Sequence, residues 1–246
     1  MSLLKAGLQL AAVTAYRTSL TNPNPSETAT KTNNVKKPRF DDLIIGALLP
    51  LGNFAIVLPA LAEMLIALAL SFPSPYSPRI LSLLGYNHKT FTAAPSVFYV
   101  AGALLAILGS MGRVHCFRVL GKHFTFNIGI IKDHVLVTAG PYSWVRHPSY
   151  TFAMVQIVGL ALMHTAPDSA TAWGLSAGTG SWLREADACK AVRAIIAVLW
   201  GFSASCILKL AVERPPVEDA FLHREFGKEW EEYARRVKYR LIPGLY

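Results

Sequence analysis

Two short stretches of this sequence carry most of the side chains that could do chemistry. The first is residues 140–150, GPYSWVRHPSY, in which an arginine and a histidine lie among tyrosine and tryptophan rings. His147-Pro148 biases the backbone towards an extended form, after which a helix can begin near Ser149 with Pro148 in its first turn. The free N–H groups of such a helix start can bind an anion such as a carboxylate. The stretch therefore predicts a polar binding turn.

The second stretch is the tail, residues 213–246, where Arg214 and Glu218 lie four positions apart. In a helix these side chains share one face, so a cation and a carboxylate would stand together. Pro215-Pro216 is expected to end the preceding helix, and Gly227 to divide the rest into two short helices. An apolar stripe at helical spacing follows: Leu222, Phe226, Trp230, Tyr233 and Val237.

Each stretch also has a plainer interpretation. Tyr142, Trp144 and Tyr150 are of the kind that forms an aromatic belt at a membrane surface. The tail stripe is typical of a helix lying on lipid. An Arg214–Glu218 pair exposed on the surface would contribute little to stability. The aromatic belt does not account for Arg146-His147-Pro148 inside the first stretch.

Apolar runs indicate the elements that position these residues. A crossing of the bilayer needs about 20 apolar residues. Four runs come close to this length, and Ser2–Tyr16 is a weaker fifth that we expect to be a retained helix rather than a signal segment. The four runs are Leu43–Phe72, Pro95–Met111, Tyr150–Ala166 and Ala191–Val212. We expect an all-α integral membrane protein with about four to five transmembrane helices and a helical tail that closes a pocket.

Details of the first run and of the loops stay open at this stage. Pro50 and Pro59 allow the first run to be one kinked helix or a hairpin. The polar segment Thr21–Asp42 is expected to be an exposed loop. Glu63 is either interior-facing or interfacial. Scattered histidines are expected to be structural, namely His115, His123 and His164.

The distribution of positive charge predicts the orientation. Lys and Arg number four in residues 21–42, five in 113–148 and seven in 213–246, but only two each in 73–94 and 167–190. With one crossing per run, the three basic segments share one face, which the positive-inside rule places in the cytosol.

Composition excludes several classes of protein. The chain is 52% hydrophobic and 16% charged, whereas soluble domains carry about 25% charged residues. The net charge of +9 comes without a nucleic-acid-binding motif, and three cysteines lack metal-site spacing. Neither G-x-G-x-x-G nor G-x-S-x-G occurs where a Rossmann enzyme or a hydrolase would need it.

Taken together, HVLVTAGPYSWVRHPSY and the tail pattern R-x-x-x-ED-x-x-L-x-x-x-FG-x-x-W-x-x-Y resemble the isoprenylcysteine carboxyl methyltransferase family over residues 113–246. The resemblance implies an integral enzyme of the endoplasmic reticulum membrane, with its active site and C-terminus facing the cytosol. It implies methyl transfer from S-adenosylmethionine to the C-terminal carboxylate of a prenylated cysteine. The implied partners are farnesyl- or geranylgeranyl-cysteine C-termini and the bilayer, with no nucleic acid and no metal.

The resemblance also implies roles for particular residues. Arg214 matches the arginine assigned to the substrate carboxylate, and Glu218 the acid that contacts the cofactor; these two are the expected catalytic residues. No role is carried onto Asn127. After Tyr150, Thr151-Phe152 departs from the glycine that the family usually has there. The other residues expected to bind the cofactor are His134, Val135, Leu136, Val137, Tyr142, His147, Pro148, Ser149 and Tyr150.

The chain is accordingly divided into an N-terminal helix and polar loop (1–42), N-terminal transmembrane helices (43–112) and a catalytic region (113–246). Three alternatives stay open. RHPxY and the tail are also similar to NADPH-dependent membrane sterol reductases, which are longer chains. A phospholipid N-methyltransferase would share the cofactor tail but accept a methyl group on an amine. A membrane scaffold would bind no cofactor.

Overall fold

The computed structural model describes residues 2–21, 23–24, 40–84, 94–124, 134–169 and 187–245, and these residues form an all-helical fold without strands. The α-helices are α1 (Ser2–Leu20), α2 (Phe40–Ser71), α3 (Ser77–Leu83), α4 (Val97–Leu120), α5 (Pro148–Thr165), α7 (Asp187–Phe226) and α8 (Lys228–Arg236). Two 3-10 turns precede the site, η1 (Gly121–His123) and η2 (Gly140–Ser143). The expected all-α class is confirmed.

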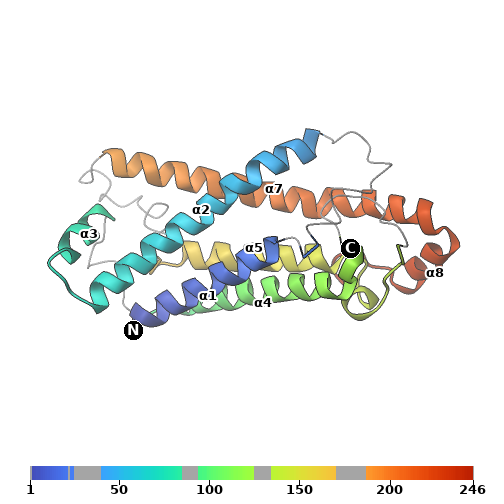
Figure 1. Ribbon diagram of the computed structural model, residues 1–246, viewed down its shortest axis with the longest axis horizontal. Coiled ribbons are helices and arrows are strands. Elements are labelled where there is room, and N and C mark those ends of the chain that lie inside the picture. Colours follow the sequence, from blue (N-terminus) through green and yellow to red (C-terminus); the bar gives the residue numbers. More distant parts are fainter. Residues whose placement is uncertain are drawn as a thin grey trace.

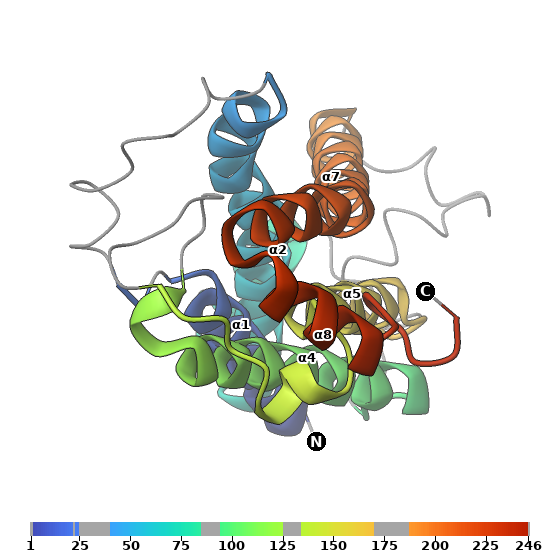
Figure 2. The ribbon, with the colours of Figure 1, turned by 90° about the vertical axis from the view of Figure 1, so that its right-hand side faces the viewer.

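The long helices form a bundle in which α4 and α5 run side by side, with α1 against α4 and α2 (Figure 1). The long helix α7 packs on α2 and α5, and α8 turns back beneath its end (Figure 2). The main core lies between α1, α4 and α5, where Ala12, Tyr99, Ala106 and Leu160 are fully buried. This packing carries residues 134–150 and the tail to the same end of the bundle.

Small residues let α4 and α5 approach closely. A Cβ atom on Gly109 would lie 2.5 Å from the backbone nitrogen of Gln156, and one on Gly102 would lie 2.5 Å from that of Met163. On the other side, a Cβ on Gly159 would collide with the backbone of Ala106. Since no side chain fits in these places, the glycines determine the spacing of the two helices.

The helices coincide with the apolar runs found in the sequence. Residues Phe40–Ser71 form one continuous helix, so the first run is a single helix and not a hairpin. Within the described residues, Val97–His123 is long and apolar enough to cross a membrane by its length and composition, and Ile56–Ser71 is a shorter apolar helix. The total number of crossings stays a prediction.

One expectation about the tail is wrong and another is confirmed. Helix α7 continues through Pro215 and Pro216 to Phe226, so the prolines do not end it. Pro215 is fully buried, so tertiary packing surrounds the helix at this point. Gly227 does divide the tail: it has a φ of +51° and separates α7 from α8.

The N-terminal helix is fastened to the bundle by a buried charge cluster. Lys5 Nζ lies 3.4 Å from Glu63 Oε1 on α2 and 3.1 Å from Asp168 Oδ2 after α5. All three side chains are at most 4% exposed. Glu63 is therefore interior-facing, which decides between its two alternatives.

Other sequence expectations lie partly or wholly outside the described residues. Most of the predicted loop at 21–42 falls there, as does Asn127. The division of the chain at residues 42 and 112 stays a prediction, and residue 112 lies inside α4.

Candidate functional site

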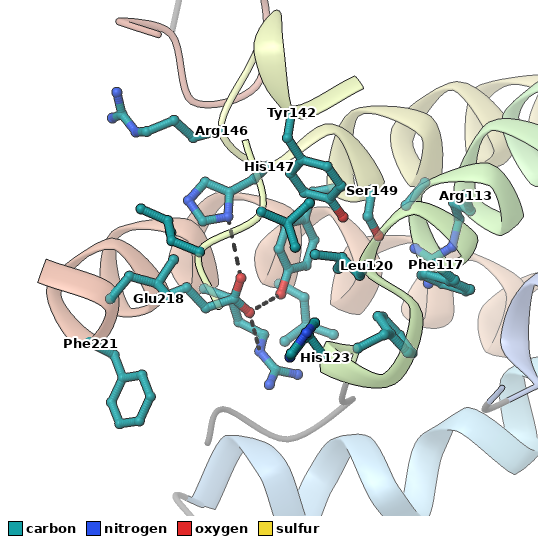
Figure 3. Close-up of a pocket in the computed structure, with 18 of the residues that line it drawn as sticks. Arg113, Phe117, Leu120, His123, Tyr142, Arg146, His147, Ser149, Glu218 and Phe221 are labelled. Atoms are coloured by element: carbon teal, nitrogen blue, oxygen red, sulfur yellow. Dashed lines mark hydrogen bonds and ion pairs between the residues drawn. The ribbon is translucent and has the colours of Figure 1, made fainter. Parts of the chain in front are cut away.

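A cavity of about 260 Å³ lies between α4, α5, α7 and the segment 134–137. It is lined by every residue expected to bind cofactor or substrate except Pro148, which is buried in the first turn of α5. Figure 3 shows Glu218 joined to His147 by a dashed line, with Tyr142 and Ser149 among the lining residues beside them. The two stretches singled out in the sequence thus meet at one site.

The first stretch folds largely as the sequence predicts. Gly140 has a φ of +60°, a conformation that glycine adopts without strain, and begins η2. Helix α5 then begins at Pro148, as expected. His147 before it has φ −128° and ψ 60°, which lies outside the extended region that the sequence predicts. Tyr142 and His147 are buried, whereas Ser149 and Tyr150 are partly exposed towards the cavity.

The end of the chain is bound to this turn along its backbone. The N–H groups of Arg146 and His147 donate to the carbonyls of Tyr239 and Arg240, at 2.9 and 2.8 Å. The Tyr233 hydroxyl donates to the Tyr142 carbonyl at 2.8 Å. The tail therefore forms part of the turn's framework and is not a helix that only lies on lipid.

Asp219 is the centre of this arrangement. Its carboxylate lies 3.1 Å from Arg146 Nη2, 2.9 Å from His147 Nε2 and 2.9 Å from Arg240 Nε. Burial would raise the pKa of Asp219, but hydrogen bonds from His147, Arg146 and Arg240 lower it to about 2. Asp219 thus stays ionised and holds three cations in place.

Glu218, one residue earlier, points into the cavity instead. It accepts a hydrogen bond from the Tyr150 hydroxyl, lies 3.3 Å from His147 Nδ1 and 3.8 Å from Arg214 Nε, and is 25% exposed. Burial would raise the pKa of Glu218, but hydrogen bonds from His147 and Tyr150 lower it. The cavity therefore presents a carboxylate that is ionised at neutral pH.

His147 joins the two carboxylates. Each ring nitrogen faces an oxygen that can only accept, so both nitrogens donate and the ring is an imidazolium. Burial would lower the pKa of His147, but its contacts with Asp219 and Glu218 raise it to about 9. The cation thereby fixes the orientation of Glu218.

The opposite wall is largely apolar. Leu136 packs with Tyr233 and Val237, next to Leu222. Burial, followed by the nearby His123, lowers the pKa of His134 to about 4, so this histidine is neutral. His123, expected to be structural, also lines the cavity.

Phe152, where the sequence differs from the usual glycine, does not line the cavity. Its ring occupies the space that a Cβ on Gly112 would fill. The bulky residue is thus accommodated by a glycine on α4.

Several lining residues were not found from the sequence. Tyr16 and Leu20 come from α1, while Arg113 and Gln156 come from α4 and α5. No local motif marks them, because only the packing of α1, α4 and α5 brings them to the cavity. Asp219 does not line the cavity but binds His147, and its role was also not found. Its one signal in the sequence is its place directly after Glu218.

The described residues are all helical and enclose a cavity with charged and apolar walls, as expected of a protein that binds a small molecule. Residues 102–177 match the model of the isoprenylcysteine carboxyl methyltransferase family. Protein-S-isoprenylcysteine O-methyltransferase A of Arabidopsis thaliana is 30% identical over 164 residues, which are 64% of this chain and 68% of that protein. The chain belongs to the isoprenylcysteine carboxyl methyltransferase family.

A second Arabidopsis thaliana relative, protein-S-isoprenylcysteine O-methyltransferase B, is 32% identical over 138 residues, 55% of either chain. The matched segment thus spans little more than half the length of that relative. A Delta(14)-sterol reductase of Gibberella zeae is 46% identical over 37 residues, which cover 15% of this chain and 8% of the reductase. The match to this reductase therefore covers only a short segment of either chain.

Proposed function

We propose that this protein transfers a methyl group from S-adenosylmethionine to the C-terminal carboxylate of a prenylated cysteine, giving a methyl ester. The observation that carries the proposal is that Arg214 and Glu218 line one cavity with residues 134–137 and with the turn at His147. A cation suited to a carboxylate and a carboxylate suited to a cation thus lie at one site. Family membership supports the same reaction.

The cavity fits the methyl donor in charge and in polarity. Glu218 is ionised and partly exposed there, as a carboxylate near a sulfonium cation should be. The apolar side chains of Leu136 and Phe221 offer surface to an adenine ring. S-adenosylmethionine, when bound, supplies a methyl group on a sulfonium sulfur, which takes the electron pair of the broken C–S bond.

The chain's own residues bind and orient the reactants. A carboxylate is ionised at neutral pH, since its pKa is about 3.5, so no general base is needed to form the new C–O bond. Arg214 would hold the carboxylate by paired N–H contacts. Glu218, fixed by His147 and Tyr150, would orient the donor.

Charge is lost as the reaction proceeds, because a cation and an anion give a neutral thioether and a neutral ester. A cavity of low polarity therefore favours the reaction once the two reactants are positioned. The buried tyrosines and apolar wall of the cavity supply such surroundings.

We place the protein in the endoplasmic reticulum membrane, with four to five transmembrane helices and the basic segments in the cytosol. Residues 113–246 would form the catalytic region. This arrangement lets the donor enter from water and the prenyl chain from lipid, which suits prenylated protein C-termini as partners.

The test is methyl transfer from labelled S-adenosylmethionine to N-acetyl-S-farnesylcysteine by the purified protein in nanodiscs. The proposal expects labelled product that base hydrolysis releases, as a carboxyl methyl ester requires. Binding of the donor without transfer would contradict the proposed acceptor and favour an amine on a phospholipid. Neither binding nor transfer, in a folded preparation, would favour NADPH and a sterol.

A further inference from the structure

Arg113 is a charged residue at the cavity that the proposed reaction has not used. It lies on α4, and its side chain lines the cavity together with Phe117. Figure 3 shows Arg113 at one side of the lining residues and Glu218 at the other. The cavity therefore has a second cationic site, apart from the Arg214–Glu218 pair.

The other arginines of the cavity are paired with carboxylates, but Arg113 is not. Asp219 pairs with Arg146 at 3.1 Å, and Glu218 with Arg214 at 3.8 Å. Across the described part of the chain, no hydrogen bond or ion pair to Arg113 is formed, and its buried Nε has no partner. Its guanidinium lies 5.3 Å from the centre of the Phe117 ring.

The remaining neighbours of Arg113 are neutral polar groups. It interacts electrostatically with Tyr16, Tyr142 and Tyr150, which come from α1, η2 and α5. Tyrosine hydroxyls and an aromatic face reduce the cost of burying a cation but do not neutralise it. Arg113 is partly buried, with its Nε withdrawn from solvent. A cation withdrawn from water without a counter-ion is disfavoured, so a partner anion is expected from a ligand in the cavity.

The proposed reaction brings two carboxylates to this cavity: the α-carboxylate of the methyl donor and the carboxylate of the acceptor. We infer that Arg113 binds a ligand carboxylate at the α4 side of the cavity. This inference rests on the proposed function. The planar guanidinium suits a carboxylate because it can donate two parallel hydrogen bonds.

The experiment compares ligands that differ in the carboxylate. S-adenosylhomocysteine is paired with 5′-methylthioadenosine, which lacks the amino-acid part, and N-acetyl-S-farnesylcysteine is paired with its methyl ester. Affinities are measured for the full-length protein in nanodiscs, and for Arg113→Gln and Arg113→Lys. Arg118→Gln is the matched control, since Arg118 is an exposed arginine on the same helix.

We expect Arg113→Gln to weaken one carboxylate ligand about 10- to 100-fold and to leave its carboxylate-free counterpart within about threefold. Arg113→Lys should lose less, because it keeps the charge but not the planar fork. A loss confined to S-adenosylhomocysteine assigns Arg113 to the donor, and a loss confined to N-acetyl-S-farnesylcysteine assigns it to the acceptor.

If the Arg113 variants lose affinity equally for both ligands of each pair, or lose no affinity, the inference is overturned and Arg113 is a packing residue. If Arg113→Gln does not fold, the same comparison with Arg113→Lys decides. If the unaltered protein transfers the methyl group and the Arg113 variants keep its ligand affinities, this inference alone is overturned. Absence of donor binding by the unaltered protein would overturn the proposed function as well.

Discussion

Two buried charge clusters in the described part of the chain, one at each end of the bundle, are built in opposite ways. In the tail cluster, one carboxylate, Asp219, is surrounded by the cations of Arg146, His147 and Arg240. In the N-terminal cluster, one cation, Lys5, is held between the carboxylates of Glu63 and Asp168.

The difference lies in what each cluster touches. The tail cluster reaches the cavity, because His147 contacts Asp219 with one nitrogen and Glu218 with the other. No member of the N-terminal cluster lines the cavity. We therefore expect changes in the tail cluster to alter ligand binding and reaction, and changes in the N-terminal cluster to alter stability alone.

The largest effect is expected from Asp219→Asn. Removing the central carboxylate leaves Arg146 and Arg240 without their counter-ion and His147 with Glu218 alone. Breaking a buried ion pair costs roughly 3–5 kcal/mol. The tail should detach from the turn, and methyl transfer should fall more than about 100-fold, which a transfer assay and limited proteolysis of the tail would record. Glu225→Gln, exposed on the same helix, is the control. A tail that stays protected, with activity near normal, would contradict the central role of Asp219.

A smaller effect on binding is expected from Glu218→Gln. The amide keeps the shape and a contact for Tyr150 but removes the negative charge that faces the donor. The affinity for S-adenosylmethionine, measured by calorimetry, should fall about 10- to 100-fold. Glu213→Gln, on the same helix with its side chain 55% exposed, should change nothing. An unchanged affinity in Glu218→Gln would remove Glu218 from the donor site.

Raising the pH should loosen the tail cluster. The pKa of His147 rises from 6.5 to about 9 on folding, so its contribution to stability is complete below pH 6.5 and is lost as the pH rises through 9. The midpoint temperature of thermal unfolding should therefore decrease as the pH is raised from 6.5 to 9. His147→Gln should have a lower midpoint with a weaker dependence on pH over this range. The same slope in both proteins would show that His147 is not the titrating group.

The smallest effect on methyl transfer is expected from Lys5→Met. Loss of Lys5 leaves Glu63 and Asp168 buried without their cation, so the unfolding midpoint should fall by several degrees. The rate, assayed below that midpoint, should stay within about threefold. Lys209→Met is the control, because Lys209 and its partner Glu213 are more than half exposed. A large loss of rate in the folded Lys5 variant would remove the contrast between the clusters.

Local features of the sequence predicted local features of the structure. Pro148 begins α5 and Gly227 separates α7 from α8, because each outcome depends on backbone restrictions of one or two residues. The same rule predicts a helix end at Pro215-Pro216, and there it is wrong: α7 continues through both prolines, and Pro215 is fully buried in the fold. The sequence rule therefore works best where no tertiary contact opposes it.

The candidate site was predicted in part for a related reason. Arg214, Glu218 and the turn at His147 belong to short motifs, and they line one cavity. Arg113 and Tyr16 stand alone in the sequence, and only the close packing of α1 and α4 brings them there. Asp219 could be read as a neighbour of Glu218, but its three partners come from segments 21 to 73 residues away.

The glycine contacts between α4 and α5 have a mechanical consequence for the cavity. At Gly102, Gly109 and Gly159 the backbones of the two helices are in contact. Neither helix can shift along or rotate against the other without a steric clash, so the two should move as one rigid unit. Arg113 and Tyr150 belong to this rigid pair of helices, whereas Arg214 and Glu218 belong to α7. Any widening of the cavity for a bulky lipid chain must therefore come from lining elements outside this pair, such as α1, α7 or the segment 134–137.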